Sequence, residues 1–201
     1  MIYGSLKKEM RKALTMKRFS HVLAVVSEVE RLCEIFEISN VSSLTASALL
    51  HDCTKPFSYE EHIAYAEKYG FVLSEDDLKS PEVLHARTGA LKAEREYGVN
   101  GDAILCHTTG KADMTVPEKI LFLADYIEKT RTHEICIETR RAFYSELESA
   151  KTLEDKLKIL DKTVLTVLEN TVRHLETKKA FIHKDTYLAI DFLKEASNET
   201  R

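Results

Sequence analysis

The sequence contains little proline or glycine and no long apolar run. Its 201 residues include 3 prolines and 6 glycines, too few for the many tight turns of an all-β protein. No segment approaches the roughly 18 consecutive apolar residues that a membrane-spanning helix needs. Residues 1–19 lack the apolar stretch and cleavage site of a signal peptide. We therefore expect a cytoplasmic protein with no membrane partner.

Paired cysteines and a strong net charge are also missing. The four cysteines lie far apart and form no C-x-x-C motif, which argues against a thiolate zinc site. We expect them to be reduced core residues. The formal net charge of −4 gives no reason to expect a nucleic-acid partner.

Apolar residues at helical spacing are what the sequence has in abundance. Hydrophobic residues make up 44% and charged residues 31% of the chain, which are ordinary values for a globular protein. From Phe19 to Phe36 apolar residues recur every three or four positions, which predicts one buried helix face. A short buried helix is predicted over Thr45–Leu50, and Pro56 follows soon after it.

Start and stop signals mark several further helices. Thr115 is a good N-cap, Pro117 suits the second helical position, and Glu118 completes a capping box with Thr115. These signals predict a helix that runs to Asp125. Other helices are predicted after Ser58, after Ser80, around Leu157–Leu175 and around Thr186–Leu193. No repeat or linker interrupts this pattern. We predict one all-α domain over residues 1–201, with nine or ten helices.

Ionisable residues follow directly on several apolar runs. His51 and Asp52 come after the run that ends at Leu50, His107 follows Cys106, and Asp125 follows another run. Burying a lone carboxylate costs several kcal/mol unless a cation or strong hydrogen bonds compensate it. Two aspartates at the ends of apolar helices therefore indicate a shared cation. Imidazole together with carboxylate suits iron, manganese or zinc.

The adjacent His51 and Asp52 suggest two metals. Neighbours on a helix diverge by about 100°, but at a helix end both side chains can reach one point. The aspartate can then bridge two metals through its two oxygens. The remaining ligand candidates are His21 and Asp125 for the first metal, and His85 and His107 for the second. A two-metal site activates a bridging water as hydroxide in phosphoryl transfer, and Lys55 could neutralise a phosphate.

Each of these residues also has a structural interpretation. A lone histidine near an apolar face is more often a hydrogen-bonded core residue than a ligand. Asp125 could pair with Arg131 or cap the turn at Glu128, and Lys55 could be a surface lysine before a proline. The remaining histidines lack any comparable pattern, and we expect structural roles for His62, His133, His174 and His183.

Five motifs in this order resemble a known family. They are Arg18-Phe19-x-His21, Leu49-Leu50-His51-Asp52-x-x-Lys55, His85, His107-Thr108-Thr109-Gly110 and Ala124-Asp125-Tyr126-Ile127-Glu128-x-x-Arg131. Together they are similar to the HD-domain metal-dependent phosphohydrolases, and most closely to the bacterial YqeK group of symmetrical diadenosine tetraphosphate hydrolases. The motifs span residues 18–131, and the segment His183–Thr186 is also similar to the C-terminus of that group.

The resemblance implies a single HD domain with a two-metal centre, in which the helices of residues 133–196 pack on the motif region. One metal would be held by His21, His51, Asp52 and Asp125, and the other by Asp52, His85 and His107. Iron is the expected metal, with manganese, cobalt or zinc as alternatives. Lys55 would face phosphate and act with Asp52 in catalysis. Substrate positions would be Arg18, Lys55, Thr108, Thr109, Gly110 and Arg131. The chain departs from the family pattern at Lys129-Thr130, where a proline-containing turn is expected.

The implied reaction is hydrolysis of diadenosine tetraphosphate to two ADP by a metal-bridging hydroxide. Two alternatives remain open. One is an HD-type phosphohydrolase of another nucleotide, such as a nucleoside mono- or triphosphate or an alarmone. The other is a non-catalytic module that senses a nucleotide. In each case the partner is a small nucleotide, and the protein is a monomer or homodimer.

Overall fold

A computed structural model describes residues 2–199, and helices are the only regular elements in this range. They are α1 (Ile2–Ala13), α2 (Met16–Ile35), α3 (Val41–Leu50), α4 (Tyr59–Lys68), α5 (Glu75–Lys79), a 3₁₀ turn (Pro81–Val83), α6 (Leu84–Tyr97), α7 (Asp102–Cys106), α8 (Val116–Ile127), α9 (Glu134–Ser149), α10 (Leu153–Thr177) and α11 (Lys184–Glu199). The predicted all-α class is confirmed. Nine or ten helices were expected and the described residues form eleven α-helices, because α5 and α7 span only five residues each. That is too short to show an apolar period.

Local signals set where the helices start, as predicted. In α4 the Ser58 hydroxyl accepts from the Glu61 N–H, while the Glu61 carboxylate accepts from the Ser58 N–H. Ahead of α8 the Glu118 carboxylate accepts from both the N–H and the hydroxyl of Thr115. These contacts fix the start of α8, and with it the position of Asp125 in the last turn of that helix.

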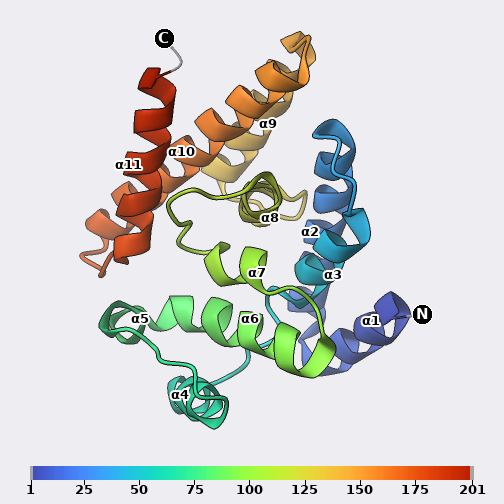
Figure 1. The fold of residues 1–201 in the computed structure, drawn as a ribbon, viewed down its shortest axis with the longest axis vertical. Helices are drawn as coiled ribbons and strands as arrows, with labels where there is room; N and C mark the ends of the chain where they lie inside the picture. The colour runs from blue at the N-terminus through green and yellow to red at the C-terminus, as the bar shows by residue number, and fades with distance from the viewer. Residues whose placement is uncertain (1, 200–201) are drawn as a thin grey trace.

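The helices pack around α8, which lies in the middle of the molecule (Figure 1). Helices α9, α10 and α11 gather on one side of α8, and α6 and α7 lie on the other (Figure 1). One continuous cluster of buried apolar side chains joins the two sides; it includes Val25 of α2, Leu121 of α8 and Val164 of α10. The C-terminal helices therefore share the core of the motif-bearing helices.

The four cysteines are buried, and none of them forms a disulfide, as expected for reduced core residues. Burial raises the pKa of the Cys53 and Cys106 thiols to about 12, which keeps them protonated and unreactive at neutral pH. No described helix is both long enough and apolar enough to cross a membrane.

Candidate metal centre

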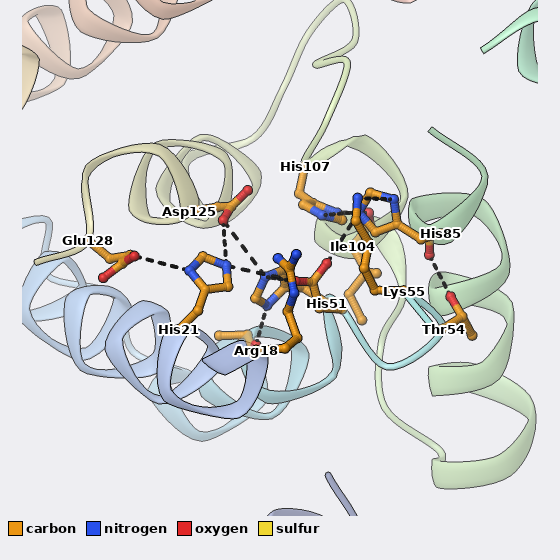
Figure 2. A network of polar contacts seen from close by, with 12 residues as sticks. Arg18, His21, His51, Thr54, Lys55, His85, Ile104, His107, Asp125 and Glu128 are labelled. Carbon is orange, nitrogen blue, oxygen red and sulfur yellow. Dashed lines mark hydrogen bonds and ion pairs between the residues drawn. The ribbon is translucent and has the colours of Figure 1, made fainter. Parts of the chain in front are cut away.

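Five helices bring the predicted metal ligands to one place. His21 lies in the second turn of α2, and Asp125 lies in the last turn of α8. His51 and Asp52 follow the end of α3, His85 lies in the first turn of α6, and His107 follows the end of α7. In Figure 2 the labelled side chains form a row from Glu128 and His21 at one end to Lys55 and His85 at the other. The structure therefore brings the predicted ligand residues together, and their assignment as metal ligands stays a prediction.

The first cluster joins His21, His51 and Asp125, whose ligand atoms all lie within 4.8 Å of one another. The Nε2 atoms of His21 and His51 lie 3.0 Å and 3.9 Å from Asp125 Oδ1. They lie 3.8 Å and 3.6 Å from Asp52 Oδ2. Asp52 thus completes a set of two imidazoles and two carboxylates.

A second cluster lies beside the first and shares Asp52 with it. His51, Asp52 and His107 offer ligand atoms within 4.8 Å of one another. His85 Nε2 lies 3.3 Å from Asp52 Oδ1 and 3.2 Å from His107 Nε2. One oxygen of Asp52 therefore faces His21 and His51, while the other faces His85, the arrangement expected of a bridging carboxylate.

The four histidines are oriented as metal ligands. The Nδ1 atoms of His51, His85 and His107 each lie 2.7 Å from a backbone carbonyl three residues earlier in the chain. The Nδ1 of His21 lies 3.1 Å from Glu128 Oε1. A proton on Nδ1 satisfies each of these acceptors, so each Nε2 lone pair is directed into the clusters. Among the described residues the buried Nε2 atoms of His21 and His51 make no hydrogen bond; the 3.0 Å approach to Asp125 lacks hydrogen-bond geometry. These donors fit a first-row metal ion.

Burial and neighbouring charges set the protonation of the ligands. Burial, together with the charge of His51, lowers the pKa of His107 to about 4, so this imidazole is neutral at neutral pH. Burial and His107 hold the pKa of His85 well below its usual value. Burial would also lower the pKa of His21, but the neighbouring carboxylates of Asp125 and Glu128 outweigh it and raise that pKa to about 9. His21 is therefore the ligand for which a proton competes most with a metal.

The two aspartates are ionised. Burial raises the pKa of Asp52, but its electrostatic interactions with the neighbouring His51 and His85 outweigh it and lower the pKa. In the same way the neighbouring His21 imidazole and the charge of Arg131 overcome the effect of burial and hold the pKa of Asp125 well below its usual value. Two carboxylates in one site are stable when cations neutralise them, and metal ions supply that charge.

Three cationic side chains border the clusters. Arg18 Nη1 donates to Asp52 Oδ2 at 2.8 Å, and Arg131 Nη2 donates to Asp125 Oδ1 at 2.6 Å. Although Lys55 is exposed overall, its Nζ lies 3.1 Å from His85 Nδ1. Burial of this amine lowers its pKa. The pairing of Asp125 with Arg131 is thus present as part of the site, despite the Lys129-Thr130 departure.

The remaining predicted substrate residues have packing roles or no described partner. Thr109 is buried and its hydroxyl donates to the carbonyl of Gly110. Gly110 has a φ of +66°, and a Cβ there would lie 3.1 Å from the Cβ of Ala189 in α11. The buried Thr108 hydroxyl makes no hydrogen bond among the described residues. A role for these three residues in substrate binding stays a prediction.

Sequence reasoning assigned no role to Glu128, which the structure places behind His21. Glu128 is fully buried, and its carboxylate also accepts hydrogen bonds from the N–H and hydroxyl of Thr130. The signal in the sequence is a charged residue directly after the apolar Ile127. By contrast, His62 has the structural role expected of it, because its ring is buried and hydrogen-bonded to Thr88.

Comparisons with known proteins agree with this geometry. Residues 18–130 match the HD domain family. The chain is 29% identical over 191 residues to a protein of Staphylococcus aureus, covering 92% of this chain and 91% of the relative. It is 30% identical over 193 residues to a protein of Bacillus subtilis, covering 93% of this chain and 95% of the relative. Both relatives are named symmetrical bis(5'-nucleosyl)-tetraphosphatase.

A solved structure is similar over almost the whole chain. It is a predicted HD superfamily hydrolase involved in NAD metabolism from Clostridium acetobutylicum. The two chains are 28% identical and superpose with a TM-score of 0.84, covering 96% of this chain and 97% of the other.

Proposed function

This chain belongs to the HD-domain family of hydrolases, and from that premise we propose that it hydrolyses diadenosine tetraphosphate to two ADP at a two-metal centre. The observation that carries the proposal is the pair of His/Asp clusters that share Asp52, bordered by Arg18, Lys55 and Arg131. The names of the relatives that match the chain over most of its length support this substrate.

The chain's own side chains divide the work of the reaction. His21, His51, Asp52 and Asp125 would hold one metal, and Asp52, His85 and His107 the other. Bound metal ions supply an activated water and polarise the phosphoryl oxygens. Lys55 and the two arginines lie where they can neutralise the negative charge that develops on a polyphosphate chain. We infer that iron is the native metal, as the resemblance to the HD phosphohydrolases implies, and the same donors would also accept manganese, cobalt or zinc.

The first experiment combines metal analysis of the purified protein with product analysis on diadenosine tetraphosphate. About two equivalents of iron and ADP as the sole product are expected. AMP together with ATP would overturn symmetrical cleavage but leave the metal site standing. Absence of metal and of turnover, even after anaerobic addition of iron or manganese, would contradict the proposal.

A matched pair of variants tests the assignment of the ligands. His51→Ala should remove both bound metal and activity. His62→Gln alters a buried imidazole outside the clusters, whose ring contacts Thr88, and should retain both. Full metal content and turnover in His51→Ala would show that the ligands are assigned wrongly.

A substrate panel separates the proposal from its two alternatives. Fast hydrolysis of a mononucleotide or an alarmone, with diadenosine tetraphosphate left intact, would identify another nucleotide as substrate. A tight nucleotide complex that stays uncleaved with added iron or manganese would identify a sensing module.

A further inference from the structure

A cavity of about 340 Å³ opens beside His21, at the end of the metal centre opposite Lys55 and His85 (Figure 2). It lies between the start of α2 and the turn that joins α8 to α9, and its lining includes Lys17, Arg18 and Arg131. Pockets for small ligands typically enclose roughly 300–1,000 Å³. The cavity is therefore large enough for part of a nucleotide, and it is continuous with the metal centre through His21.

The charge of the cavity suits phosphate. Lys17, Arg18 and Arg131 line it, and the acidic side chain in its wall, Glu128, is fully buried and engaged by His21 and Thr130. A guanidinium has five N–H donors. Among the described contacts, Arg18 donates one of these N–H groups to Asp52. The wall of the cavity thus offers cationic hydrogen-bond donors next to Asp52, the carboxylate assigned to both metals.

Symmetrical cleavage requires room at both ends of the metal centre. Four phosphates separate the two nucleosides, so cleavage in the middle leaves one nucleoside diphosphate on each side of the attacked bond. One half would extend toward Lys55, the cationic side chain at the His85 end of the metal centre. The cavity provides space and positive charge at the other end, and its lining also includes the exposed ring of His133.

We propose that this cavity binds the second nucleoside diphosphate half of the substrate, with Lys17 and Arg18 on its phosphates and the His133 ring against its base. Bases commonly stack on flat side-chain rings, histidine among them. The inference rests on the proposed function, because only a substrate with two nucleosides needs this second subsite. It makes His133 a specificity residue that distinguishes dinucleotides from mononucleotides, and Lys17 a phosphate-binding residue of the second subsite.

The number of ADP molecules bound to the metal-loaded protein tests this without turnover. Calorimetric titration should give two ADP per chain for the natural sequence. Thr132 lines the cavity and is exposed, so Thr132→Trp should fill the space without disturbing the core and reduce the number to one. Lys17→Glu should weaken the binding of the second ADP about tenfold or more. Lys129→Glu is the matched control, since this neighbouring exposed lysine does not line the cavity, and it should still bind two ADP.

A kinetic comparison gives an independent measurement. Thr132→Trp should raise the KM for diadenosine tetraphosphate about tenfold or more and leave hydrolysis of adenosine tetraphosphate, which has one nucleoside, unchanged. One bound ADP in the natural protein, or an equal effect of Thr132→Trp on both substrates, would overturn the second subsite and leave the proposed function intact. Failure of the natural protein to cleave diadenosine tetraphosphate would overturn both.

Discussion

At the scale of single residues, His21 differs from the other histidine ligands in what holds it. Backbone carbonyls hold His51, His85 and His107, whereas a side chain, Glu128, holds His21. A carboxylate behind a histidine fixes its tautomer and makes the imidazole a stronger ligand. Because this partner is a side chain, its contribution can be removed by substitution.

Glu128→Gln should weaken metal binding at the His21 cluster about 10- to 100-fold, because the amide lacks the negative charge that raises the basicity of His21. Metal titration of the stripped protein measures this. Glu118→Gln is the control: Glu118 is a buried glutamate of α8 that pairs with Lys111 away from the clusters, and a glutamine there can still accept the Thr115 hydrogen bonds that start α8. Equal metal affinity in both variants would show that Glu128 does not support His21.

The opposite pKa shifts of His21 and His107 predict how the metal-free protein responds to pH. The pKa of His21 is raised to about 9, so its stabilising contribution is complete below pH 6.5 and is lost as the pH rises to 9. The pKa of His107 is lowered to about 4, so the unfolded state binds the proton more strongly, and stability is lost as the pH falls from 6.5 to 4. Their combined contribution is greatest near pH 6.5.

Urea unfolding of the chelator-treated protein at pH 5, 6.5 and 9 measures this dependence. His21→Gln should remove the loss of stability between pH 6.5 and 9 and retain the loss in acid. An unchanged alkaline slope in His21→Gln would contradict the assignment to His21.

At the scale of elements, a buried arginine ties together the helices that position His85 and His107. Arg87 of α6 donates to Asp77 of α5 at 2.6 Å, to the carbonyl of Leu105 in α7 at 2.6 Å and to Asp185 of α11 at 2.8 Å. His183 adds a contact of 3.2 Å to Asp77. The C-terminal helix is therefore connected by charge to the elements that carry the second cluster.

Arg87→Met should lower the free energy of unfolding by about 3–5 kcal/mol, because it leaves the buried carboxylate of Asp77 without its cation. Urea unfolding measures this change. Lys194→Met removes an exposed pair with Glu169 and should cost less than about 1 kcal/mol. Equal effects of the two substitutions would show that the Arg87 network does not hold these helices together.

At the scale of the whole molecule, the metal centre links helices from both ends of the motif region. The ligands come from α2, α6 and α8 and from the residues that follow α3 and α7. A metal that binds only the folded state stabilises it by about 4 kcal/mol at 1,000 times its Kd. A metal bound at this site would therefore contribute to holding the molecule together.

Chelation should lower the Tm by about 10 °C, since 1 kcal/mol corresponds to roughly 2–4 °C for a domain of this size. Scanning calorimetry with and without chelator measures the shift. Asp52→Ala, which removes the ligand that the two metals would share, should show no shift on chelation. A shift of equal size in that variant would mean that the stabilising metal binds elsewhere.

The sequence by itself determined the helices and the kinds of ligand. The apolar period of Phe19–Phe36 and the capping box at Thr115 depend on residues within a turn or two of each other, so they can be recognised locally. The placement of His51 and Asp52 after an apolar run likewise indicated a helix end that carries a buried charge. Five-residue helices were missed because they are shorter than the period that reveals them.

Only the tertiary structure decided how these parts meet. The contact of His21 with Glu128 joins residues 107 positions apart, and that of Arg18 with Asp52 joins residues 34 apart. Which oxygen of Asp52 faces which histidine, and the cavity beside His21, depend on how whole helices pack around α8. Periodicity records which face of a helix is buried, but it carries no information about the partner that covers that face.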